Sequence, residues 1–153
     1  MTPEEHRRLG VELYNGTWEL IERQDRTPEE DDEMLHRAHA SAYHWLQGPH
    51  TAANLARSHW LCARVHALAG QPEGALHHAR RCLAIVESHG GEMEDWDLPG
   101  AYEAMARAHL AAGEDAEAAR YKSLGLEAAA KIAEEDDRKH IEADLDALPL
   151  EAG

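Results

Sequence analysis

No stretch of the chain alternates apolar and polar residues over four to eight positions, as a half-buried β-strand would. Alanine-rich segments of mixed polarity follow one another instead, separated by short turns that contain Gly or Pro. Val and Ile, which favour strands, are scarce. The pattern therefore predicts an all-α fold. The predicted helices cover about 3–24, 28–47, 51–69, 72–88, 98–112, 115–133 and, as a shorter element, 136–147.

Helix-start signals mark most of these boundaries. The sequence Thr-Pro-Glu-Glu occurs at 2–5 and again at 27–30, and each copy offers a hydroxyl cap, a proline in the first turn and acids that face the helix dipole. Thr51, Pro72 and Pro99 mark further starts. Connections of two to four residues imply antiparallel neighbours, so the chain is predicted to form successive helical hairpins.

Two segments of the chain repeat one another at a constant offset. Residues 63–75 and 106–118 share six of thirteen positions when shifted by 43. A repeated hairpin favours a stacked solenoid over a closed bundle.

Both segments resemble the tetratricopeptide repeat. Ala63 and Ala106 fall on its small first-helix position, and Ala75 and Ala118 on its second-helix alanine. Small residues there let paired helices approach closely. His66 and His109 stand where the motif prefers Tyr, while its large second-helix aromatic is Ala79 in one unit and Lys122 in the other, and its terminal Pro is missing. The usual period of 34 is exceeded by about nine residues, at 90–98.

This resemblance implies one domain, a right-handed stack of three hairpins closed by a short C-terminal helix. Residues 3–47 would form a degenerate first hairpin, 51–88 and 98–133 two clear repeats, and 136–147 the capping helix. The segments 39–45 and 75–83 also resemble small uncharacterised bacterial proteins with tetratricopeptide-like folds, a likeness that implies no activity.

In such repeats, first-helix positions line a concave groove, which here implies Arg57, Trp60, Arg64, Glu103 and Arg107. Guanidinium forks bind carboxylates bidentately, so this groove would suit a peptide, a partner protein or an anionic ligand. A scaffold of this kind predicts that Arg64→Glu abolishes partner binding while the thermal melt stays within a few degrees. In the alternative interpretation, Arg64 and Arg107 pair with acids of adjacent helices and Trp60 fills core.

Histidine is unusually frequent, with twelve in 153 residues. Imidazoles from neighbouring helices bind transition metals such as zinc. The second hypothesis is therefore a metal-dependent or small-molecule enzyme in the same concavity, with His39 and His44 as ligands and Glu103 as a carboxylate. His66 and His109, at packed motif positions, are expected to be buried and hydrogen-bonded. No HExxH or phosphate-loop motif is present, so no catalytic residue is assigned and the scaffold hypothesis needs no cofactor.

The balance of charged residues limits the classes of binding partner that are expected. Asp and Glu number 30 against 15 Lys and Arg, a formal charge of -15, which disfavours nucleic acids and acidic membrane surfaces. With no apolar run of membrane-spanning length and no apolar leader, a cytoplasmic protein is expected.

Cys62 and Cys82 lack metal-motif spacing and are expected to be free thiols. Uncapped repeat ends would also favour a homo-oligomer.

Overall fold

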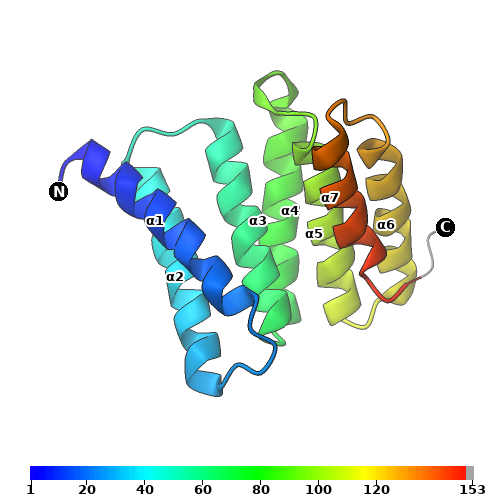
Figure 1. The fold of residues 1–153 in the computed structure, drawn as a ribbon, viewed down its shortest axis with the longest axis horizontal. Helices are drawn as coiled ribbons and strands as arrows, with labels where there is room; N and C mark the ends of the chain where they lie inside the picture. The colour runs from blue at the N-terminus through cyan, green and yellow to red at the C-terminus, as the bar shows by residue number, and fades with distance from the viewer. Residues whose placement is uncertain (151–153) are drawn as a thin grey trace.

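The structure is a computed structural model that describes residues 1–150 of the chain. Within that range it contains seven α-helices, one short 3₁₀ helix and no strand (Figure 1). The predicted all-α class and helix number are therefore confirmed. The helices are α1 (Pro3–Ile21), α2 (Pro28–Gln47), α3 (Ala52–Leu68), α4 (Pro72–Ser88), α5 (Asp97–Ala111), α6 (Asp115–Ala129) and α7 (Glu135–Asp146), and the 3₁₀ helix η1 is Gly90–Glu92.

Threonine caps begin the first three helices as predicted. Thr2, Thr27 and Thr51 each accept a hydrogen bond from the backbone N–H three residues on, and the side chain at that third position accepts one from the threonine N–H. This reciprocal capping box satisfies two of the backbone donors that a helix start leaves free.

Two helices end three to four residues earlier than the sequence pattern predicts. Helix α1 stops at Ile21, where the Arg26 guanidinium folds back and donates to the carbonyls of Leu20 and Arg23. A side-chain donor can satisfy carbonyls that the helix end exposes. Helix α6 stops at Ala129, and the turn that follows buries Ile132 against Leu145 of α7.

Neighbouring helices pack in chain order, so α1 and α2 form one end of the stack and α6 lies near the other (Figure 1). Helix α7 covers the α6 end, because Leu145 is buried and lies against Gly125. Lys122 donates to the carbonyl of Leu148. The opposite end is uncovered: on α2, Tyr43 is 56% exposed and Leu46 is 55% exposed.

The segments related by the 43-residue offset have the same local geometry. Gly70 and Gly113 have φ of 73° and 75°, a left-handed conformation that glycine adopts without strain. The N–H that follows each glycine donates back to the carbonyl of His66 or His109, at 2.8 and 2.9 Å. The repeat therefore extends from sequence to backbone.

Side-chain packing also repeats at this offset. All four motif alanines are buried, at positions 63, 75, 106 and 118. His66 stacks on His78, and the equivalent His109 stacks on Tyr121, both with ring centroids 5.5 Å apart. Each of these two histidines also hydrogen-bonds the side chain five residues on. His109 is buried as expected, whereas His66 is only partly so.

Candidate binding site

A cavity of about 450 Å³ opens on one side of the stack, between α1, α3, α5 and α7. The chain has four tryptophans, and all four line this cavity. They come from different elements: Trp18 from α1, Trp45 from α2, Trp60 from α3 and Trp96 from the residue before α5. The packing of the helices thus gathers indole rings that are far apart in the sequence.

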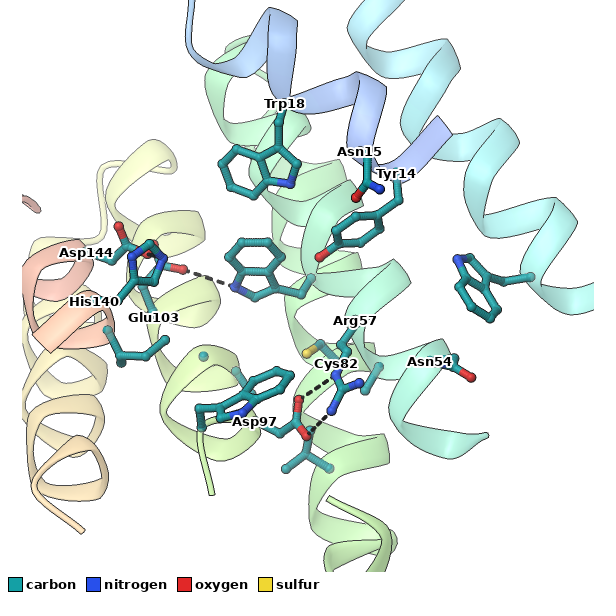
Figure 2. Close-up of a pocket in the computed structure, with 18 of the residues that line it drawn as sticks. Tyr14, Asn15, Trp18, Asn54, Arg57, Cys82, Asp97, Glu103, His140 and Asp144 are labelled. Atoms are coloured by element: carbon teal, nitrogen blue, oxygen red, sulfur yellow. Dashed lines mark hydrogen bonds and ion pairs between the residues drawn. The ribbon is translucent and has the colours of Figure 1, made fainter. Parts of the chain in front are cut away.

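An arginine and a buried aspartate form one wall. Arg57 donates from Nε and a terminal nitrogen to both oxygens of Asp97, at 3.0 and 2.9 Å, and its guanidinium lies 4.2 Å from the ring centre of Trp96 (Figure 2). Asp97 also accepts a hydrogen bond from the backbone N–H of Glu94. This bidentate pair fixes the link before α5 against α3.

Glu103 is the centre of a second ionic group. This residue is only 2% exposed, and its carboxylate accepts hydrogen bonds from Arg64 at 3.2 Å, from Arg107 at 2.8 Å and from the Trp60 indole at 3.3 Å. Burial alone would raise the pKa of the carboxyl, but the two guanidinium groups and the indole hold that pKa below its ordinary value. Glu103 is therefore a buried anion whose partners are supplied by the fold.

Arg64 is structural rather than exposed on the groove. It is 8% exposed, and its guanidinium lies 5.0 Å from the ring centre of Trp60 and 5.7 Å from that of Trp18. Arg64→Glu is therefore expected to lower the melting temperature, contrary to the expectation from the sequence. That substitution would place a second buried carboxylate beside Glu103.

Of the five residues predicted for the groove, Arg57, Trp60 and Glu103 line the cavity. Arg64 and Arg107 contact Glu103 from outside the lining. Carboxylates of the chain itself pair with all three arginines. Arg64 pairs with Glu103 of another helix, as the alternative interpretation expected, whereas Arg107 pairs with Glu103 of its own helix and Trp60 lines the cavity. The cavity therefore offers aromatic surface more than free positive charge.

Polar groups border the aromatic surface. Tyr14 and Asn15 reach in from α1, Asn54 from α3, and His140 and Asp144 from α7 (Figure 2). Burial raises the pKa of the Tyr14 phenol, so its hydroxyl stays protonated and can donate a hydrogen bond. A ligand could thus bury an apolar group between the rings and place polar groups at this border.

The histidines predicted as metal ligands have separate partners. His44 lies 2.9 Å from His6 of α1, between Nδ1 atoms. His39 lies 2.9 Å from His66 of α3, between Nε2 atoms. Five positions apart on a helix, His39 and His44 point roughly 140 degrees apart. Glu103 is engaged with arginines, so this structure does not assemble the set His39, His44 and Glu103.

A different histidine group lies around His39. Side chains from α2, α3 and α4 meet there, namely His39, His59, Cys62, His66 and His78. Burial and the neighbouring imidazoles lower the pKa of His39 and His78, the latter to about 3, and burial and Arg81 lower that of His59 to about 4. These three imidazoles are neutral at physiological pH. Burial also raises the pKa of Cys62 and Cys82 to about 12, and both are free thiols.

Sequence reasoning missed most of the cavity. Tyr14, Trp18, Trp45 and the α7 residues carry no motif, and only the fold brings them to the side chains of α3 and α5. One signal was available, since a chain without Phe and with only 5% aromatic residues nevertheless has four tryptophans. Tryptophan kept in so aromatic-poor a chain points to a packing or binding role.

Among residues 1–150, no helix combines the length and apolar character that crossing a bilayer requires. The chain matches no protein-family model, and it shows no significant match to any curated protein or to any solved structure.

Proposed function

We propose that the chain is a short tetratricopeptide-like solenoid that acts as a protein-interaction module. In this proposal, a peptide segment of a partner protein places one aromatic or large aliphatic side chain in the tryptophan-lined cavity. The 43-residue repeat in sequence and backbone supports the solenoid, and repeat stacks commonly use their concave side for binding.

The observation that carries the proposal is the convergence of all four tryptophans on one opening. Apolar surface that is left unpacked forgoes stabilisation of roughly 25 cal/mol per Å². A fold selected for stability alone gains by closing such an opening. Tryptophan and tyrosine are also the residues that most often dominate binding energy at interfaces.

The charges favour a neutral anchor with basic flanks. Arg57 is neutralised by Asp97, and Arg64 and Arg107 share Glu103, so an anion entering the cavity would compete with carboxylates already in place. The whole chain has a formal charge of -15, which attracts cationic partners and accelerates their association. The expected ligand is therefore an apolar side chain followed by Lys or Arg, and not an anion.

Filling the cavity tests this proposal. Gly100 lines the cavity, and a Cβ there would meet only the Trp60 indole nitrogen, at 4.0 Å. We expect Gly100→Leu to block binding without destabilising the fold, because a helical glycine is replaced by a better helix former. Glu127→Leu adds the same side chain to an exposed position of α6 outside the cavity and serves as the matched control.

The measurement is selection from a random peptide library displayed against the untagged protein, followed by titration of the selected peptides. Indole fluorescence should change on binding, since every tryptophan lines the cavity. We expect enriched peptides with an aromatic or large aliphatic residue beside Lys or Arg, at least tenfold weaker on Gly100→Leu and unchanged on Glu127→Leu. Enriched peptides that bind Gly100→Leu equally well, or binding of small aromatic molecules without any peptide, would contradict the proposal.

A further inference from the structure

We infer that His39, Cys62 and His78 form a binding site for a divalent transition-metal ion of the zinc and cobalt type. Each of the three side chains offers one donor atom, and these atoms lie within 4.8 Å of one another. The site is separate from the tryptophan-lined cavity, and its test does not depend on the proposed peptide binding.

Three packed helices hold the donors in place. His39 comes from α2, Cys62 from α3 and His78 from α4. Cys62 is 1% exposed, while His39 is exposed and His78 is half-buried. An ion can therefore enter from solvent past the imidazoles and reach the thiol beneath them. Two imidazoles and one thiolate form a donor set typical of zinc, with a fourth position left for water or a further ligand.

Hydrogen bonds around the site set the tautomer of His39. The Gln71 Oε1 atom lies 2.7 Å from Nδ1 of His66, and because an amide oxygen only accepts, His66 must carry its proton on Nδ1. The Nε2 atom of a neutral His66 then accepts from Nε2–H of His39, 2.9 Å away. This leaves a free lone pair on Nδ1 of His39, the atom that lies 3.8 Å from the Cys62 sulfur.

Such outer partners are the usual means by which proteins orient metal-binding imidazoles. His78 has one as well, since its Nδ1 lies 3.0 Å from Nδ1 of His59. When His59 accepts this hydrogen bond, the lone pair of His78 is on Nε2. Metal binding then requires only that the Cys62 thiol release its proton to solvent as the metal–sulfur bond forms.

The second repeat unit provides an internal comparison. Residues 43 positions after Cys62 and His78 are Met105 and Tyr121. The Tyr121 ring still stacks on His109 at 5.5 Å, as His78 stacks on His66. Because the same packing forms with tyrosine, the stacking alone does not require imidazole at position 78.

Cobalt titration of the untagged protein tests the site. Co²⁺ bound by a thiolate in tetrahedral geometry gives an ultraviolet charge-transfer band and intense visible bands. We expect one equivalent of Co²⁺ to produce both, and Zn²⁺ to displace it. His78→Tyr, which copies the second unit, and Cys62→Ala should each abolish the charge-transfer band and weaken binding by more than the roughly 10–100-fold that loss of an outer-shell partner costs.

The controls separate this site from scattered surface histidines and from folding defects. Cys82→Ala removes the other buried thiol, which lines the tryptophan cavity, and should leave the spectrum unchanged. Gln71→Met should weaken binding, by less than the roughly 10–100-fold that loss of a direct partner of a ligand costs, because Gln71 acts on His39 through His66. Gln71→Glu, which keeps the accepting oxygen, should restore it. Where Cys62→Ala fails to fold by circular dichroism, His78→Tyr decides the result. A weak octahedral spectrum, or a charge-transfer band that survives His78→Tyr, would overturn the inference.

Discussion

Glu103 shows how much of this fold depends on one buried carboxylate. It joins α5 to α3 by accepting hydrogen bonds from Arg64 and Trp60, and it holds Arg107 of its own helix. The repeat offset aligns Glu103 with Trp60 itself, so equivalent positions of the two units bond to each other. Removing this single anion takes away the acceptor that the Arg64 and Arg107 guanidinium groups share.

Glu103→Gln should therefore lower the free energy of unfolding by about 3 kcal/mol, the lower end of the cost of breaking a buried ion pair. The lower end applies because Asp144 remains 3.8 Å from Arg64. Urea denaturation monitored by circular dichroism measures this loss. In the control Glu117→Gln, which breaks an exposed pair with Arg120, the free energy of unfolding should not change measurably, because solvent screens the pair. If Glu103→Gln and Glu117→Gln lowered the free energy of unfolding equally, the buried Glu103 group would add no more stability than an exposed ion pair.

Local signals predicted the helices well and the cavity poorly. Thr-Pro-Glu-Glu marks a helix start because cap, proline and acids act within four residues, and both copies begin helices in the structure. The early end of α1 depends on Arg26 folding back to carbonyls three to six residues earlier, a contact that no helix-stop pattern encodes. Contacts such as Arg57 with Asp97, forty positions apart, depend on how hairpins stack.

The same difference between local signals and long-range contacts explains which site residues could be predicted from the sequence. The resemblance to the tetratricopeptide repeat predicted that Arg57, Trp60 and Glu103 share one groove, and all three line the cavity. It could not show that Arg64 is buried with Glu103, since a motif position gives the direction of a side chain but not what meets it. The metal hypothesis likewise took two ligands, His39 and His44, from one helix, whereas the neighbours of His39 come from α3 and α4.

The two turns with left-handed glycines give a prediction at the level of the element. Gly70→Ala and Gly113→Ala should each lower the free energy of unfolding by about 1 kcal/mol, because a Cβ is strained at φ near 75° although open space surrounds both positions. Gly91→Ala is the control, since Gly91 also faces open space but does not have a positive φ. Denaturant midpoints report the three values, and unequal losses at Gly70 and Gly113 would contradict the equivalence of the two turns.

Acid should destabilise the whole metal-free molecule through the histidine group. The folded pKa values of His59 and His78, about 4 and about 3, lie below the ordinary value near 6.5. The unfolded chain therefore binds protons that the folded chain does not, and stability is lost as the pH falls from about 6.5 toward 4. Besides each other, the groups that face these two imidazoles are His39 of α2, Cys62 and His66 of α3, and His77 and Arg81 of α4.

Thermal melts followed by circular dichroism between pH 8 and pH 5 measure this effect. The melting temperature should fall by several degrees in the wild type and less in the double variant His59→Tyr with His78→Tyr, which adopts the tyrosine pair of the second unit. His89→Gln, at an exposed position, should behave as the wild type does. A melting temperature that stays constant over this range would contradict the lowered pKa values.

The unequal ends of the stack bear on how copies can assemble. Helix α7 seals one end with buried Leu145, while the other presents Tyr43 and Leu46 to solvent. Head-to-tail growth into a filament needs complementary surfaces at both ends, and a sealed end removes one of them. If copies associate through Tyr43 and Leu46 of α2, each copy uses the same surface, and the contact is a two-fold dimer that closes on itself. Sedimentation should therefore show nothing larger than a dimer at any concentration. The Tyr43→Glu variant should sediment only as a monomer.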